Sequence, residues 1–563
     1  MGNAKKVKKA RTKSDIWYTV LAIIIGACLL FGLGVAILQP TGLMDYISLH
    51  ANTAIKSDHY SVNNAQFMYL TYNYYQNIIQ NYYSGSSASL SDEQKTSYIS
   101  MCKSYVSSEW TTILAVCEAA RAEGYSLNDE DKQYVEDNME ALSTAAKQYN
   151  MSVSSFIAAM YGSKGIKQGD IKSVIELQRL ASSYQTKLND DFSYSEEDYS
   201  KYYEDNKNDF LKADYYSYTI KADYASDADD EAKEAARTEA EAKAQELFSR
   251  IEGGEDYITV ITEYEKSLAQ AEKEAAEKAL EEAKAAETET ETEADTAEAA
   301  DTETVAESES EAETEPAKTA EETALDNAVA KLEGITEESV KTSVLKEGYK
   351  ASTSENTKEL DEWIFAESPA QNGAVKKIKF DSDDTVVIYQ IVKSAYRDEY
   401  NTVTIRELGL SATSFKGEDD EVNEDAMKEY AQKITDAYNN GADKSAEAFD
   451  KLVDEYSTDE IPVGSSGQLK EVSKNGGTDA SDIEIDEWLF SEERKAGDVK
   501  SFVVYSDGEL QGITIIYFEE TGRAKWLYDV DSAMRSKDLE TKIDEFTQTY
   551  NVTVNEKSID KVK

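Results

Sequence analysis

The sequence predicts an α+β chain with an N-terminal transmembrane helix, a helical domain completed by a C-terminal helix, and two tandem α/β modules. Three observations lead to this fold class. An uncharged apolar run covers residues 16–38, helical periodicity covers residues 45–209, and a Trp-containing pentapeptide occurs twice, as Asp361–Phe365 and Asp486–Phe490. The two copies begin 125 residues apart (486 minus 361). Because solenoid repeats recur at roughly 20–50 residues, this spacing indicates duplication of a whole domain.

Composition excludes several function classes. The chain has 563 residues, a formal charge of −52 and a pI near 4.4, which argues against a nucleic-acid partner because phosphate contacts need clustered Lys and Arg. The only histidines are His50 and His59. We therefore expect no His-ligated metal site, no Ser-His triad and no cofactor in the modules.

The N-terminus predicts a membrane anchor. Residues 1–15 form a basic tail, which we expect in the cytoplasm, and residues 16–38 would be about 35 Å long as a helix. That length crosses a hydrocarbon layer of ~30 Å, so the lipid bilayer is an expected partner and the remaining chain is expected outside a bacterial cell membrane.

Two alternatives to this anchor stay open. A cleaved signal peptide would need a shorter apolar core and a small-residue site, which residues 39–42 do not supply well. Residues 25–28 are similar to a lipoprotein box in which Cys28 would be lipidated, although the sequence stays apolar through Leu38. Span length favours the uncleaved anchor.

The helical domain, residues 45–209, is dense in aromatic side chains. Tyr69, Tyr72 and Tyr75 fall in one such stripe, and stripes at this spacing are usually core. The alternative is a cradle for unfolded polypeptides, since Tyr offers amphipathic contact area. Ser91 and Asn128 stand where helix N-caps are expected.

Cys102 and Cys117 fall within one predicted helix of the same domain. Fifteen residues of helix separate them by about 22 Å, which is too far for a disulfide. We expect both to be free thiols in the core.

The first module, residues 210–397, is interrupted by an insertion over about residues 266–323. Its central part, residues 288–317, contains no Lys, Arg or aromatic residue, so it cannot bury enough apolar surface to order itself. An acidic spacer is expected, with binding of cations or cell-wall polymers as the alternative.

The second module, residues 400–525, begins with a strand at Val403–Leu408 and a helix at Val422–Tyr438. Further strands are expected at Lys500–Tyr505 and Gly512–Phe518. Residues 526–563 then contain the helix that we expect to pack back on the helical domain.

This order of elements resembles the parvulin (rotamase) family of peptidyl-prolyl isomerases. The residues that carry the resemblance are Phe449–Leu452, Tyr456–Asp459, Gly467–Leu469, Leu489–Phe490 and Gly497–Val499. The whole layout resembles extracytoplasmic foldases and chaperones built from parvulin modules, and it implies unfolded or newly secreted polypeptides as partners.

The chain departs from the family pattern at the catalytic positions. Parvulins that isomerise prolines pair a His on the first strand with a His on the last, and these places fall on Glu407 and Thr514 in the second module and near Tyr218 and Gln390 in the first. Glu407 and Thr514 either form a substitute hydrogen bond or are ordinary strand positions. By the same resemblance, Leu469 and Phe490 are expected to line the substrate groove.

Three hypotheses of function follow. The chain is a parvulin-type isomerase and chaperone, a chaperone that holds clients without catalysis, or a cell-surface scaffold that binds one fixed partner. Amide rotation needs no acid, base or metal, only a dry pocket and contacts that favour the twisted amide, so loss of the histidines weakens the isomerase hypothesis without excluding it.

Overall fold

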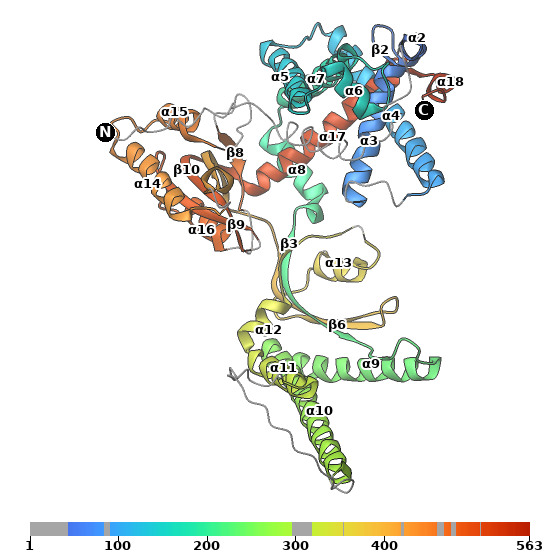
Figure 1. The fold of residues 1–563 in the computed structure, drawn as a ribbon. Helices are drawn as coiled ribbons and strands as arrows, with labels where there is room; N and C mark the ends of the chain where they lie inside the picture. The colour runs from blue at the N-terminus through green and yellow to red at the C-terminus, as the bar shows by residue number, and fades with distance from the viewer. Residues whose placement is uncertain are drawn as a thin grey trace, which may run out of the picture. The chain divides into compact units, whose positions relative to one another are not determined.

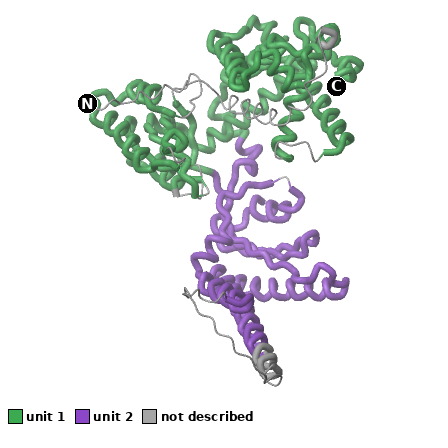
Figure 2. Tube along the Cα trace, in the orientation of Figure 1, with its two compact units in different colours: residues 1–202, 398–563 green, residues 203–397 purple. Residues whose placement is uncertain are grey.

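The computed structural model describes residues 43–83, 90–294, 318–352, 354–366, 368–417, 421–458, 467–474, 480–506 and 508–562. The chain divides into two compact units, residues 203–397 and the combination of residues 1–202 with 398–563 (Figure 2).

Within the described residues the chain forms seventeen α-helices and three small antiparallel sheets (Figure 1). The helices are α2 (Leu43–His50), α3 (Asn64–Tyr82), α4 (Asp92–Ala122), α5 (Asp129–Gln148), α6 (Val153–Tyr161), α7 (Gln168–Asp191), α8 (Glu196–Asp205), α9 (Asp230–Glu252), α10 (Tyr257–Ala294), α11 (Ala320–Gly334), α12 (Glu337–Val344), α13 (Lys358–Ile364), α14 (Glu424–Asn440), α15 (Ala446–Tyr456), α16 (Ala480–Leu489), α17 (Lys525–Thr549) and α18 (Glu556–Ile559). The strands are β1 (Thr53–Lys56), β2 (Ser61–Asn63), β3 (Lys212–Lys221), β4 (Leu345–Tyr349), β5 (Val375–Phe380), β6 (Thr385–Tyr396), β7 (Asn401–Ser411), β8 (Gln468–Val472), β9 (Val499–Ser506), β10 (Glu509–Ala524) and β11 (Thr553–Val554).

The helical domain packs α3 to α7 around a core that includes Trp110, Phe156 and Tyr184. Ser91 and Asn128 cap α4 and α5 with capping boxes, which confirms the helix starts expected there. Both Cys102 and Cys117 lie in the single helix α4 as free, buried thiols, as the spacing predicted. Burial raises the pKa of Cys117 to about 12, which makes that thiol a poor nucleophile.

The last residues of the chain join the helical domain. Strand β11 pairs with β1 in the sheet β11-β1-β2, and Ile559 and Val562 are buried in the helical core. Asn64 and Ser558 exchange two hydrogen bonds, of 2.9 and 2.7 Å. The phenyl ring of Phe546 on α17 lies 6.2 Å from the ring of Tyr184 on α7.

The unit of residues 203–397 contains a four-stranded antiparallel sheet of order β4-β3-β6-β5. Helices α9, α10 and α12 cover one face, where Leu247, Ile261 and Ile388 are buried. Helix α13, which holds most of the first pentapeptide, packs against the other face through Leu360 and Ile364.

Within the other unit, residues 401–524 form a sheet of order β8-β7-β10-β9. Helices α14 and α15 cover one face, and α16, which holds most of the second pentapeptide, covers the other. The two sheets therefore have the same strand order, with β3, β4, β5 and β6 in the places of β7, β8, β9 and β10.

Backbone hydrogen bonds align the two sheets residue by residue. The amide of Gly373 donates to Ile391, and the amide of Gly497 donates to Phe518, at the same turn of each copy. Both glycines have positive φ (82° and 91°), which L residues rarely adopt. Ile391 thus corresponds to Phe518.

The predicted fold class is wrong in its first element. Among the described residues, no helix is long and apolar enough to cross a membrane, because charged side chains recur along the long helices α4 and α10. We correct the fold class to a mixed α+β structure, and the predicted single-pass membrane location is corrected with it. The sequence features behind that prediction, residues 1–15 and 16–38 with Cys28, lie outside the described residues.

Candidate functional site

Glu407 and Thr514, the two positions expected to replace the parvulin histidines, are in contact. Glu407 lies on β7 opposite Ile516 of β10, and Thr514 lies two residues along β10, so both side chains share the α16 face of the sheet. The Thr514 hydroxyl donates a hydrogen bond of 2.5 Å to Oε1 of Glu407. The structure therefore shows the hydrogen bond that we considered as a substitute for the histidine pair.

Neighbouring residues hold this pair in place. Phe502 of β9, which is buried, pairs with Thr514. Gly467 has no side chain, and its backbone carbonyl accepts a hydrogen bond of 2.9 Å from the backbone amide of Glu407. A Cβ at position 467 would lie 2.4 Å from the Glu407 carbonyl oxygen, so only glycine fits. Glycine at the start of β8 thus allows the two strands to approach.

The pair offers acceptors but no free donor. A Thr hydroxyl has one proton, which is already donated to Glu407, and an ionised carboxylate only accepts. No Lys or Arg of the described residues forms an ion pair with Glu407, since Arg406 on the opposite face pairs with Asp450 and Glu519. The arrangement therefore cannot donate a hydrogen bond to the carbonyl oxygen of a bound peptide.

The two expected groove residues lie at different places. Leu469 pairs with Ile405 beside Glu407, and its side chain is 39% exposed. The ring of Phe490 packs edge-on against Tyr400 at 5.3 Å, before the start of β7. Seven residues of extended chain, about 20 Å, separate Tyr400 from Glu407. The structure places Leu469 opposite Ile405, two residues along β7 from Glu407, and places Phe490 at the other end of the face.

The counterparts expected in the first module, Tyr218 and Gln390, are wrong by an odd number of residues. The alignment through Ile391 makes Ser217 correspond to Glu407 and Val387 to Thr514. An odd shift along a strand moves a side chain to the other face. Tyr218 accordingly donates to Glu265 of α10 on the opposite face, and Gln390 lines a pocket there.

The corresponding face of the first module holds an open groove of about 400 Å³ beside α13. We call it the tyrosine groove. It is lined by Tyr215, Thr219, Tyr349, Asn356, Thr357, Leu360, Phe380, Asp383, Thr385, Val387 and Tyr389.

Three rings form the floor of the tyrosine groove. Tyr215 lies edge-on to both Tyr349 and Tyr389, with centroid distances of 5.2 and 5.6 Å. The Tyr349 hydroxyl donates to Asp361 of the repeated pentapeptide at 2.8 Å, which fixes that ring. The pentapeptide thus positions one wall of the groove as well as the core.

The hydroxyls of Tyr215 and Tyr389 form no hydrogen bond with another described residue, and neither is one of the fully buried polar atoms that lack a partner, so both reach the open space of the groove. Burial raises the pKa of Tyr215 to about 12, and burial also raises the pKa of Tyr389. Both phenols are therefore protonated donors at neutral pH. A ligand that supplies acceptors can replace water at these two donors.

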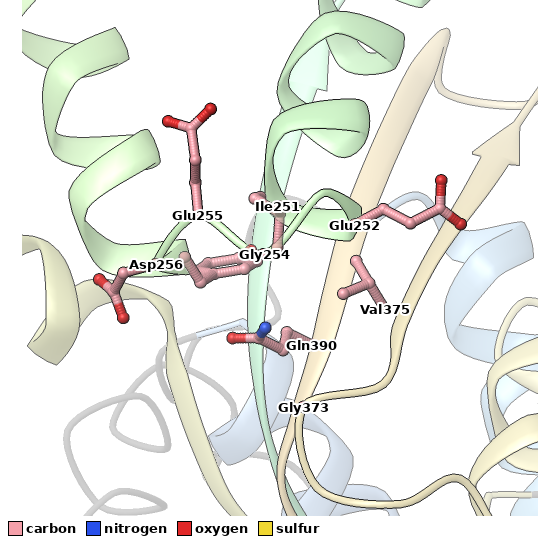
Figure 3. A pocket seen from close by; sticks show the side chains of 9 residues that line it. Ile251, Glu252, Gly254, Glu255, Asp256, Gly373, Val375 and Gln390 are labelled. Carbon is pink, nitrogen blue, oxygen red and sulfur yellow. The ribbon is translucent and has the colours of Figure 1, made fainter.

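Two other pockets are weaker candidates. The pocket that Gln390 lines, about 490 Å³, contains Glu252, Glu255 and Asp256, whose carboxylates point in different directions (Figure 3). Within the described ranges, no group of three or more His, Cys, Asp or Glu residues is placed to hold a metal ion. A second pocket, about 520 Å³, lies between α4 and α7 beside the exposed Tyr105.

The aromatic stripe of α3 is mostly core. Tyr69 and Tyr75 are buried, Tyr74 donates to Glu109 at 2.7 Å, and only Tyr82 projects freely, with 79% exposure. The stripe thus stabilises the helical domain.

Sequence reasoning missed the tyrosine groove because its lining comes from β3, β4, α13, β5 and β6. The Tyr-rich alternation of β3 was a signal, but its register was not readable. No protein-family model matches the chain, and no curated protein sequence is significantly similar to it. The parvulin resemblance therefore stays a prediction.

Proposed function

We propose that the protein is a folding factor, built on two parvulin-like modules, that holds unfolded polypeptide segments without isomerising prolines. The observation that carries this proposal is the tyrosine groove, whose lining includes two phenol donors that form no hydrogen bond with another described residue. An extended polypeptide supplies what the groove lacks, since its backbone carbonyls accept hydrogen bonds and its apolar side chains pack on tyrosine rings.

Chemistry in the second module supports holding over catalysis. Isomerisation requires contacts that are stronger for the twisted amide than for the planar one. The Glu407–Thr514 pair has its only donor already used, so it would repel a carbonyl oxygen instead of stabilising it.

The test measures suppression of aggregation of a chemically reduced client protein by the full chain. Light scattering is followed for the wild-type chain and for the double variant Tyr215→Phe/Tyr389→Phe, which keeps the rings and removes only the two hydroxyls. We expect the variant to need several-fold more protein for equal suppression, since each lost hydrogen bond is worth about 1 kcal/mol.

The matched control is Tyr216→Phe. Tyr216 neighbours Tyr215 on β3, but its ring stacks on Tyr257 on the opposite face. Suppression by this variant should equal that of the wild type. Equal suppression by the double variant and the wild type would show that the tyrosine groove does not hold clients.

The second candidate function is peptidyl-prolyl isomerisation, favoured by the contact of Glu407 with Thr514 at the positions expected for the histidine pair. Exchange of a proline peptide is measured with micromolar full chain. We expect no acceleration. Acceleration that the variant Glu407→Ser/Thr514→Val abolishes would make the second module an isomerase.

A further inference from the structure

Strand β9 forms an edge of the second sheet. Among the strands that the structure describes, it pairs with β10 alone, and it is the longest of the four outermost strands of the two modules. Its sequence, VKSFVVYS, contains one charged residue, Lys500, and no proline. A long apolar edge of this kind is a ready template for another strand.

The direction of each backbone group along β9 follows from one hydrogen bond. The amide of Phe518 donates to the carbonyl of Asp498 at 2.9 Å, so residue 498 faces β10. Because facing alternates along an antiparallel pair, residues 500, 502 and 504 also face β10. Val499, Ser501, Val503 and Tyr505 consequently point their amide and carbonyl groups away from the sheet.

None of these four outward residues forms a backbone hydrogen bond with another described residue. Both faces of the strand are nonetheless supported, by Val503 against the α14 side and by buried Phe502 against the α16 side. The edge is therefore held in strand geometry while its polar groups stay available.

The equivalent edge strand of the first module is protected. Strand β5 carries Lys376, Lys377 and Lys379 in six residues, and charged side chains on an edge prevent pairing with other strands. The two copies thus differ in the feature that controls strand addition.

We infer that the outer edge of β9 binds an extended segment of another polypeptide by strand addition. The occupant alternates apolar residues and is neutral or basic. Lys500 is already paired with Glu484 at 2.8 Å, and Lys428 is paired at 2.6 Å with Glu424, which also accepts a hydrogen bond from Tyr505. The cations that the described residues place beside β9 are thus already neutralised, which disfavours an acidic segment. A second copy of this chain is disfavoured, because each copy carries a formal charge of −52.

This inference rests on the proposed function only in the choice of an unfolded client as occupant. The β9 edge belongs to a different unit from the tyrosine groove. Variants of the groove and of the edge therefore distinguish failure of one proposal from failure of the other.

The test uses the full chain and a fluorescent ten-residue peptide of alternating Val and Thr with a Lys at each end. Ser501→Pro removes one outward amide and keeps the β10 pairing, since edge positions tolerate proline. Ser501→Ala is the matched control because it keeps that amide. We expect Ser501→Pro to weaken peptide binding about fivefold or more, and Ser501→Ala to bind as the wild type does.

Two further measurements avoid dependence on the folding of a variant. Two versions of the same peptide are made, one N-methylated at its odd-numbered residues and one at its even-numbered residues. Each is titrated against the unchanged protein. Only the version whose methyl groups replace the amide hydrogens facing β9 should bind more weakly, by about tenfold or more. Equal binding of both methylated peptides, or equal binding by Ser501→Pro and Ser501→Ala, would overturn strand addition. Self-association of the peptide-free chain that Ser501→Pro abolishes would instead assign the edge to a second copy.

Discussion

The α13 face of the first sheet and the α16 face of the second have the same strand order but different side chains. Tyr215 and Tyr389 in the first correspond to Ile405 and Ile516 in the second, and Ile378 corresponds to Phe502. Phe502 packs against Trp488 at 5.5 Å and fills its face, whereas the first module keeps an open groove.

This difference shows how a duplicated scaffold separates stability from binding. The pentapeptide and the glycine turn keep the same backbone bonds in both copies. Substitutions at a few inward strand positions then decide whether a face is filled or open. Four predictions probe this contrast, from the largest expected effect to the smallest.

Gly512 corresponds to Thr385 of the first module, yet the two positions should not be exchangeable. A Cβ at residue 512 would lie 2.3 Å from the Leu410 carbonyl oxygen. Gly512→Thr should destabilise the second module by about 3 kcal/mol or more, and Thr385→Gly the first by only about 1 kcal/mol. Denaturant unfolding followed by fluorescence of Trp488 and Trp363, with the other tryptophans replaced, measures each. Equal losses would mean that the two sheets have the same clearance at this position.

Thr514→Val introduces the residue type that stands at the corresponding position of the first module, and it leaves the Glu407 carboxylate without its hydroxyl donor. The expected loss is about 1–2 kcal/mol of unfolding free energy, measured by the same method. The double variant Glu407→Ser/Thr514→Val should lose less than the sum of the single changes, because the orphaned charge is gone. Additive losses would show that the hydrogen bond contributes nothing.

Tyr215→Phe/Tyr389→Phe should alter the stability of the first module by less than about 0.5 kcal/mol, since neither hydroxyl has a partner to lose. Thermal unfolding measures this effect. Together with the expected fall in aggregation suppression, unchanged stability would assign the two hydroxyls to binding. A loss above about 1 kcal/mol would instead indicate partners within the chain.

Acid should act on the two modules in opposite directions. Hydrogen bonds from Arg237, then Tyr224, hold the pKa of Asp384 below its usual value. The stabilisation that ionised Asp384 gives the folded state is present above about pH 4, and it is lost as the pH falls through the folded-state pKa of this carboxyl group. Burial raises the pKa of Asp450 despite its hydrogen bond to Arg406. Ionised Asp450 therefore destabilises the folded state, and protonation removes this destabilisation as the pH falls.

The measurement is the unfolding midpoint of each module between about pH 3 and 6, compared with Asp384→Asn and Asp450→Asn. We expect Asp384→Asn to reduce the fall of the first module's unfolding midpoint at low pH. We expect Asp450→Asn to remove the rise of the second module's unfolding midpoint at low pH. A first module whose acid response survives Asp384→Asn would locate the titrating group elsewhere.

Alternation of apolar residues predicted strands close to those observed, as at β7 and β10, and capping residues predicted the starts of α4 and α5. The contact of Glu407 with Thr514 followed from their matching positions on adjacent strands. Tyr218 and Gln390 were misplaced because a continuous run of apolar and aromatic residues does not reveal the pairing register, which the structure sets with Ser217 opposite Tyr389.

The tyrosine groove and the β9 edge were beyond prediction for another reason. The tyrosine groove depends on the lack of a bulky side chain that would fill the face of the sheet. The β9 edge depends on the lack of a further strand that would pair with it. A single sequence records the residues of a strand but not which of its sides stays unpaired.

Asn64 and Ser558 are 494 residues apart in the chain, yet they close the helical domain together with β1 and β11. On the ribosome, strand β1 is made long before its partner strand β11, so the helical domain closes only after both modules have been synthesised. Closure of the helical domain is thus a late step in folding. A product that stops before β11 leaves β1 without that partner strand and lacks Ile559 and Val562, which are buried in the helical core, so we expect it to be sensitive to proteolysis.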